Sequence, residues 1–274
     1  MTEYTAGNTP ASPRRTEGVT ICIPNWNHRC FLPRCVSSAM RAVTSLAAHG
    51  VESEILVVDD VSRDGSRPLL ISIMQLYPEA PIRVIFQARN GGPSRARNTA
   101  IAAARYRHIC MLDADNTLEH DNLIYFHRAL RDTGASMVYG NLLTLANGRP
   151  FSFQSNYIVG NGIVDSNYID SFCVVDAEAF ELLGGYIEGD RMDLFEDWEM
   201  VLHLFSEGHL VCFVPMVLGH YHKYTLSRFG GLGEEYANVK QQRAMRRRFD
   251  QIGVRSNDHR FSWRIYHPDM GFLS

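Results

Sequence analysis

Two aspartates one residue apart, Asp113 and Asp115, follow an apolar run in the stretch HICMLDADN (108–116). Side chains two positions apart on an extended segment point to the same side, so we expect the two carboxylates to project together. Like charges so close repel each other, and a buried unpaired carboxylate is costly. Mg²⁺ or Mn²⁺ relieves both problems by binding carboxylates together with waters and phosphate oxygens. The pair therefore suits a metal–diphosphate site, although aspartates that cap a turn produce the same short pattern.

Polar residues also end two other apolar runs of the chain. PNWN (24–27) follows the first run, and DDVSRDGS (59–66) follows the second. In open α/β sheets, ligands bind at the carboxyl ends of the strands. We therefore expect these two segments and the aspartate pair to meet at one edge of a sheet.

Apolar runs alternate with helical patterns, which predicts an α/β fold with a mainly parallel central sheet and helices on both faces. Continuous apolar runs predict strands at 19–24, 53–60, 82–86, 108–115 and 136–140. Helical spacing, together with stops such as Gly50 and Pro78, predicts helices at 30–50, 67–78, 93–106 and 120–134.

The alternation becomes irregular after about residue 141. The remaining patterns are a strand and short helix at 171–186, a helix at 195–208, a strand at 209–215 and a helix at 234–251. We expect residues 1–17 to be a disordered tail, because they are rich in Thr, Pro, Gly and Ser. Residues 18–230 are expected to form one domain, on which a C-terminal helix and tail, residues 231–274, would pack.

The composition excludes several classes of protein. The chain has 274 residues, 45% of them hydrophobic, which is enough for one large core. A net charge of −3 argues against a nucleic-acid binder. No apolar run approaches the ~20 residues of a transmembrane helix, and the N-terminus lacks an apolar signal core. The six cysteines form no CxxC pair, so we expect mostly buried free thiols and a cytoplasmic protein.

Five motifs, in order, resemble those of the family 2 inverting glycosyltransferases of the GT-A fold. They are IPNWN (23–27), VVDDVSRDGS (57–66), NGGPSRARN (90–98), LDAD (112–115) and FEDWE (195–199). The resemblance spans about residues 19–228. It implies that residues 18–230 form a GT-A domain that transfers a sugar, with inversion, from a nucleotide-diphosphate donor to an acceptor hydroxyl. UDP is the nucleotide we expect. Asn25, Trp26 and Val61 depart from the usual Thr, Tyr and Gly of the family.

The resemblance places the donor at the ends of the first strands. Asp60 would accept a hydrogen bond from a uracil N–H, which is a strong bond for a carboxylate; alternatively, it caps the loop DVSRDG. Arg97 would contact the nucleotide, because a guanidinium matches phosphate geometry. The residues expected around the nucleoside are Pro24, Asn25, Trp26 and Asn27.

The resemblance also implies a Mn²⁺ or Mg²⁺ cofactor. Asp115 would bind the metal directly, and Asp113 would contact the ribose or the metal. His222, in GHYHKYTLSRF (219–229), resembles a histidine that helps to hold the metal or diphosphate in some members. A lone histidine is otherwise usually a packing or surface residue, and Lys223 and Arg228 are alternative contacts for the diphosphate.

Inverting transfer needs a general base for the acceptor hydroxyl. Asp197, the second acid of EDWE, matches the family's base, and Glu196 is its competitor. Adjacent helical residues diverge by ~100°, so the two acids are not expected to face one hydroxyl. The alternative for Asp197 is an acid placed at a helix N-terminus by the helix dipole.

Two rival functions are less consistent with the sequence. A sugar nucleotidyltransferase is expected to carry a glycine-rich loop after the first strand, and PNWNHRC has no glycine. A non-catalytic sugar-nucleotide-binding protein would not need the metal acids together with Glu196 and Asp197.

The acceptor stays open among a glycan, a lipid-linked saccharide, a protein and a small molecule, and the sequence does not indicate an oligomeric state. The basic run RAMRRRF (243–249) is expected to be a solvated face. The alternative is a peripheral contact with anionic lipid headgroups.

Overall fold

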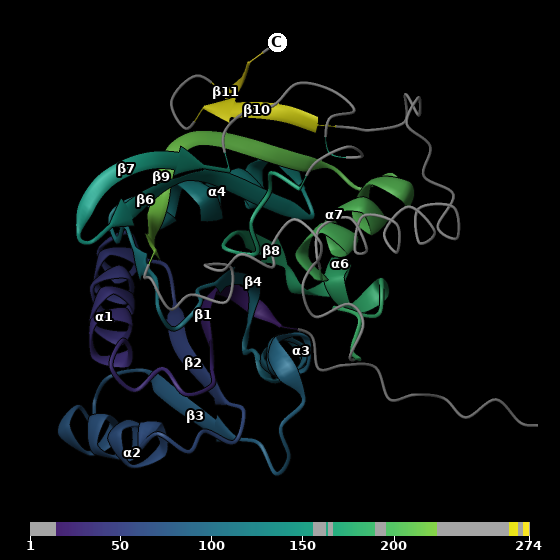
Figure 1. The fold of residues 1–274 in the computed structure, drawn as a ribbon. Coiled ribbons are helices and arrows are strands. Elements are labelled where there is room, and N and C mark those ends of the chain that lie inside the picture. Colours follow the sequence, from purple (N-terminus) through teal and green to yellow (C-terminus); the bar gives the residue numbers. More distant parts are fainter. Residues whose placement is uncertain are drawn as a thin grey trace, which may run out of the picture.

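The computed structural model describes residues 15–155, 163, 167–189, 196–223, 263–267 and 271–273. It shows one sheet with helices on both faces (Figure 1). The main path of the sheet has the order β11-β10-β9-β6-β8-β4-β1-β2-β3. Neighbours in the half that carries the first motifs run parallel: β1 (Thr16–Asn25), β2 (Ser53–Asp59), β3 (Ile82–Phe86) and β4 (Tyr106–Met111).

The other half of the sheet is mixed. The short strand β8 (Val174–Asp176) is antiparallel to its neighbours β4 and β6 (Met137–Ala146). The long strand β9 (Val211–Lys223) is parallel to β6 and to β10 (Trp263–His267). The remaining strands pair antiparallel at the margins: β5 (Thr117–Leu118) with β9, β7 (Arg149–Gln154) with β6, and β11 (Gly271–Leu273) with β10.

Two hydrophobic clusters lie on opposite faces of this sheet. One receives α1 (Leu32–Ala48), α2 (Ser66–Leu76) and α4 (Leu123–Thr133). The other receives α3 (Gly92–Ala103), α6 (Ala177–Leu182) and α7 (Glu196–Ser206). Alternate residues of one strand serve the two clusters: in β1, Ile21 and Ile23 belong to the first, and Cys22 belongs to the second. Burial on both faces explains why the central strands are apolar without interruption.

The α/β fold with a mainly parallel central sheet is confirmed, and so is the order of strands and helices through α4. The strands predicted at 136–140 and 209–215 are longer than predicted, as β6 and β9. Among the described residues, three strands were not predicted: β5, β10 and β11. Strand β7 lies in a segment where we expected irregular loops and short strands without definite bounds. Thr16 and Glu17 belong to β1 and not to a disordered tail. The helix predicted at 234–251 and the basic run 243–249 lie outside the described residues.

The prediction of an extended segment through the aspartate pair is wrong. Strand β4 ends at Met111, and the backbone N–H of Asn116 donates to the carbonyl of Asp113 at 2.9 Å. This bond closes a turn over residues 113–116, which leads directly into β5. Aspartate and asparagine favour such turns because their side chains can bond locally to the backbone.

Two further expectations bear on the class of protein. All six cysteines are free thiols, and five of them are buried. Within the described ranges, no helix has the length and apolar character that a bilayer crossing requires.

Candidate functional site

The ends of β1, β2 and β4 lie at one edge of the sheet, as the motif positions predict. The register of β1 and β2 places Asn25 opposite Asp59. The Asn25 side-chain amide donates to Asp59 Oδ1 at 2.8 Å and to the Ser62 hydroxyl at 3.1 Å, so two of the motifs are joined directly. The LDAD motif follows β4, which is parallel to β1 on its other side.

The aspartate turn, residues 113–116, brings two acidic side chains to this edge. Burial, and then the neighbouring Asp113, raises the pKa of Asp115 above its ordinary value. Arg34, at the start of α1, donates to the Asp115 carbonyl at 2.6 Å and holds the turn against that helix. The pair therefore has the property expected of a cation site, since a bound cation would favour both charged forms.

Arg97 joins the aspartate turn to the start of α7. Its guanidinium donates to Asp113 Oδ1 at 2.9 Å and to Glu196 Oε1 at 2.6 Å, and its side chain is only 5% exposed. A third bond reaches the Ser171 hydroxyl at 3.1 Å. Burial alone would lower the pKa of Arg97, but Asp113 and Glu196 outweigh it and hold that pKa well above its usual value. In this structure the guanidinium binds carboxylates of the protein itself.

The two adjacent acids of α7 have different environments. Glu196 is ion-paired with Arg97, whereas Asp197 Oδ1 accepts hydrogen bonds from the backbone N–H of Trp198 at 2.7 Å and from the Asn167 amide at 3.1 Å. Burial, then Glu196 and then a further acid, Asp170, raises the pKa of Asp197 to about 7. A carboxyl group with a pKa near neutrality is suited to general-base chemistry.

Asp170 is a site residue that the sequence reasoning missed. Burial, and then Asp113, raises its pKa to about 6. Its Oδ1 accepts from the backbone N–H of Phe172 at 2.9 Å, just before β8. The available signal was a single acid in the apolar context YIDSFCVV (168–175). That signal is weak, because nothing in the sequence shows that β8 inserts between β4 and β6.

His222 lies close to the aspartate turn. Its backbone N–H donates to the side-chain carbonyl of Asn116 at 3.1 Å, and its Nε2 is 3.2 Å from the hydroxyl of Thr117. Burial, and then Arg34, lowers the pKa of His222 to about 4, so the ring is neutral at pH 7. His220 is 3.4 Å from the same hydroxyl through Nδ1. The β5–β9 pairing is what brings these histidines to the turn.

The loop after β2 is tied to the start of α3. Asp60, which is 2% exposed, accepts from the backbone N–H of Gly92 at 2.8 Å and from that of Gly91 at 3.0 Å. The alternative that Asp60 caps its own loop is therefore wrong: the Ser62 and Ser66 amides bond to Asp59 and Asp64 instead.

The residues of the first motif, at the end of β1 and just after it, divide into a buried and an exposed set. Pro24 is in β1 opposite Val58, and Asn25 is 1% exposed. Trp26, by contrast, is 50% exposed. Asn27 has a positive φ of 58°, and its side-chain oxygen accepts from the Arg63 N–H at 2.7 Å. Trp26 thus offers a large aromatic surface beside the motifs, on a loop held by hydrogen bonds.

Asp113, Asp115 and His222 do not form a compact three-ligand group. Among the described residues, the group of three with ligand atoms mutually within 4.8 Å is Glu17, His108 and His127, none of which belongs to the five motifs. A Mg²⁺ or Mn²⁺ ion does not need three protein ligands, since it commonly keeps waters and substrate phosphate oxygens.

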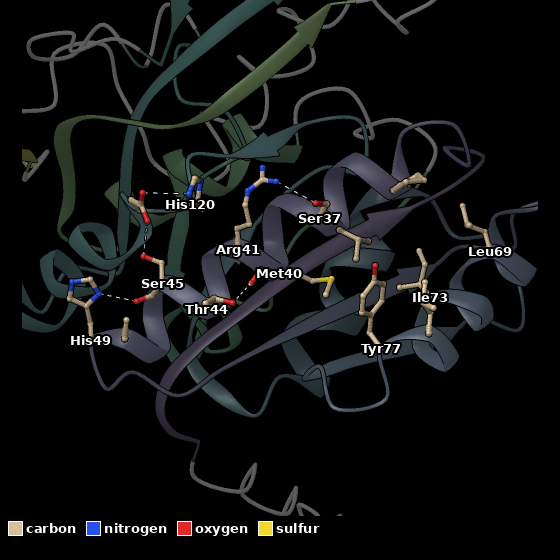
Figure 2. Close-up of a pocket in the computed structure, with 15 residues that line it drawn as sticks. Ser37, Met40, Arg41, Thr44, Ser45, His49, Leu69, Ile73, Tyr77 and His120 are labelled. Atoms are coloured by element: carbon tan, nitrogen blue, oxygen red, sulfur yellow. Dashed lines mark hydrogen bonds and ion pairs between the residues drawn. The ribbon is translucent and has the colours of Figure 1, made fainter.

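A separate apolar groove of about 860 Å³ lies along α1 and α2 (Figure 2). Its wall includes Met40, Ile73 and Tyr77, and His120 lies at one end. No predicted site residue lines this groove. The candidate site is therefore the edge of the sheet where β1, β2 and β4 end, and not this groove.

Comparison with known proteins agrees with the family that the motifs resemble. The model of the family "Glycosyl transferase family 2" matches residues 20–158. The chain belongs to this family. A 133-residue segment is 35% identical to the succinoglycan biosynthesis protein ExoO of Rhizobium meliloti, and it covers 48% of this chain and 35% of that protein. A 122-residue segment is 32% identical to chondroitin synthase of Pasteurella multocida, and it covers 44% of this chain and 12% of that protein. The chain thus spans about a third or less of these relatives.

Solved structures show the same fold at low sequence identity. TarS from S. aureus, in complex with UDP-GlcNAc, superposes with a TM-score of 0.62 at 14% identity, over 88% of this chain and 74% of that one. The mannosyltransferase PcManGT from Pyrobaculum calidifontis, in complex with GDP-Man and Mn²⁺, gives 0.61 at 16% identity, over 85% and 67%.

Proposed function

We propose that the protein is a metal-dependent inverting glycosyltransferase that transfers a sugar from a UDP-sugar to an acceptor hydroxyl. One observation carries the proposal: Arg97 connects the aspartate turn, suited to a metal-bound diphosphate, with the acid pair that includes Asp197. A donor-side charge centre and a candidate base are thereby held in one buried network, in a chain of the glycosyltransferase family.

Asp115 and Asp113 would hold Mn²⁺ or Mg²⁺, with His222 beside them. Their fit rests on the chemistry of the set: two close carboxylates, one with a raised pKa, and a neutral imidazole near the same turn. When bound, the ion would stabilise negative charge on the departing nucleoside diphosphate.

Asp60 and the loop after β1 would bind the nucleoside. A carboxylate has about four lone-pair sites, and the Gly91 and Gly92 amides leave room for one more donor, such as the uracil N–H. Trp26 supplies an exposed aromatic surface, and Pro24, Asn25 and Asn27 shape the loop around it. Binding of UDP-GlcNAc by TarS supports UDP, and the GDP-Man complex of PcManGT makes GDP the first alternative.

Asp197 would act as the base and Glu196 as the partner of Arg97. With a pKa of about 7, Asp197 is partly ionised at neutral pH and can accept the proton of the acceptor hydroxyl. The relatives' names, succinoglycan biosynthesis and chondroitin synthase, favour a saccharide acceptor over a protein or small molecule. A lipid-linked saccharide fits equally well, with the enzyme acting in the cytoplasm.

The test is calorimetric titration of UDP into the protein with Mn²⁺ and, separately, with EDTA. We expect binding that requires the metal and is lost in Asp115→Ala but kept in Asp121→Ala, a control at an exposed aspartate nearby. Binding that is unchanged by EDTA would contradict metal dependence. Absence of UDP, GDP and dTDP binding would contradict the donor assignment, and donor binding without turnover of any sugar nucleotide would indicate a non-catalytic protein.

A further inference from the structure

A cluster of two histidines and a glutamate lies toward the edge of the sheet opposite the motifs. His108 is the third residue of β4, His127 is in α4, and Glu17 is the second residue of β1. The chain runs five residues from His108 to Asp113, which is roughly 16 Å at the rise of an extended strand. The cluster is therefore separate from the aspartate turn.

The two imidazoles face each other inside the protein. His108 and His127 are 3% and 2% exposed, and their Nδ1 atoms are 2.8 Å apart. One ligand atom from each histidine and one from Glu17 lie within 4.8 Å of one another. Glu17 Oε1 is 3.9 Å from His127 Nε2. Three elements distant in sequence thus bring nitrogen and oxygen ligands to one point.

Three arginines lie near the cluster, Arg107, Arg128 and Arg131, and two of them are paired with carboxylates. Arg107 donates to Asp176 at 2.8 Å, and Arg131 donates to Asp132 at 2.8 Å. The carboxylate of Glu17, whose side chain is 55% exposed, supplies negative charge at the outer side of the cluster. A cation at this point would meet one carboxylate and two imidazole side chains.

We propose that Glu17, His108 and His127 form a second metal site, specific for a zinc-type divalent cation. Two imidazole nitrogens and one carboxylate oxygen are a frequent zinc set, with water in the fourth position, whereas Mg²⁺ prefers oxygen ligands. With Zn–N bonds of ~2.0 Å at tetrahedral angles, the facing nitrogens would open to ~3.3 Å. A bound ion would tie β1, β4 and α4 together.

The experiment uses metal-free full-length protein without nucleotide and titrates it with Zn²⁺, with the metal content and the melting temperature as readouts. We expect one tightly held zinc per chain, resistant to excess Mg²⁺, and a higher melting temperature when it is bound. Substituting Co²⁺ should give the visible absorption of a tetrahedral site. Glu17→Gln, at an exposed side chain that folding does not require, should weaken zinc binding by at least ~10-fold, since loss of even an outer partner has that effect.

Two further variants make the result decisive. His127→Gln should abolish zinc binding, whereas Asp115→Ala should leave it unchanged, because that aspartate belongs to the other edge of the sheet. The proposal is overturned if wild type retains no zinc, or if Glu17→Gln and His127→Gln bind it as tightly as wild type. It is also overturned if Asp115→Ala loses the ion, which would place the zinc at the aspartate turn. None of these readouts depends on glycosyl transfer.

Discussion

Arg97 Nη1 donates to Glu196 Oε1 at 2.6 Å across 99 positions of the sequence. The other end of the same guanidinium holds Asp113. One buried cation therefore sets the distance between the aspartate turn and the start of α7. It also neutralises Glu196, which leaves Asp197 as the acid of that pair not bound by Arg97.

Replacing Arg97 should destabilise the fold strongly. Arg97→Met would leave Asp113 and Glu196 without their buried partner, and breaking such a pair costs about 3–5 kcal/mol. Arg97→Lys should lose less stability than Arg97→Met, because lysine keeps the positive charge but not the forked geometry of the guanidinium. Urea unfolding measures both, with Arg41→Met, at an exposed arginine of α1, as the control. Equal stability of Arg97→Met and Arg41→Met would show that the bridge is not important for folding.

Asp197→Asn should lose turnover but keep donor binding. Removal of a general base lowers kcat by about 10²–10⁴-fold, while the aspartate turn and the nucleoside loop stay intact. Steady-state rates with a donor sugar nucleotide, together with calorimetric Kd values for UDP, separate the two effects. Glu196→Gln is the matched comparison, expected to reduce stability through Arg97. A fully active Asp197→Asn enzyme would show that Asp197 is not the general base.

The rate of transfer should rise with pH through about 7, following ionisation of Asp197. The acid form cannot accept a proton, so kcat should fall roughly tenfold per pH unit well below that value. A pH profile of kcat at saturating donor is the measurement. In Asp197→Asn the residual kcat should no longer rise with pH through about 7. If the variant shows the same rise, the ionisation belongs to another group.

Stability should respond to pH in the opposite direction. The pKa of Asp197 is about 7 in the folded protein and ~3.9 in the unfolded chain, so the folded state binds its proton more tightly. This contribution to stability is complete below the unfolded pKa and is lost as pH rises toward 7. Asp197→Asn should therefore gain stability relative to wild type between about pH 5 and pH 8, by ~1 kcal/mol or more. Parallel melting curves across this range would contradict the shift.

Val61 should be a point of backbone strain. It has a positive φ of 62°, where the related motif has glycine, and a β-branched residue is disfavoured there by about 1–2 kcal/mol. Val61→Gly should raise the free energy of unfolding by ~0.5–1 kcal/mol after the added entropy of the unfolded chain is subtracted. Val61→Ala, which keeps a Cβ, should gain less. If alanine equals glycine, the strain comes from side-chain bulk and not from φ.

The first half of the fold was predictable because its signals are local. Apolar runs, helical spacing and stops such as Pro78 all act within a few residues, and the motif residues follow strands at fixed positions. The end of β4 was misjudged because Asp113 closes a turn with Asn116, and a backbone hydrogen bond leaves no mark on apolar periodicity.

The interior of the site was not predictable, because it depends on contacts between distant segments. Asp170 reaches the network through β8, which pairs with strands on both sides. His222 reaches the turn through the β5–β9 pairing, and β5 has only two residues. In both cases the pairing of strands that are distant in sequence, and not the residues next to it in the chain, decides what surrounds the side chain.

The alternation of β1 residues between the two hydrophobic clusters bears on how the protein melts. Because Ile21 and Cys22 anchor opposite faces of one strand, neither helical layer can detach without exposing the other's half of the core. We therefore expect the described core to unfold in a single cooperative transition. Ligands bound at opposite edges of the sheet would then stabilise the folded protein against the same unfolding transition. A nucleotide–metal complex at one edge and an ion at the other would shift one calorimetric peak by additive amounts.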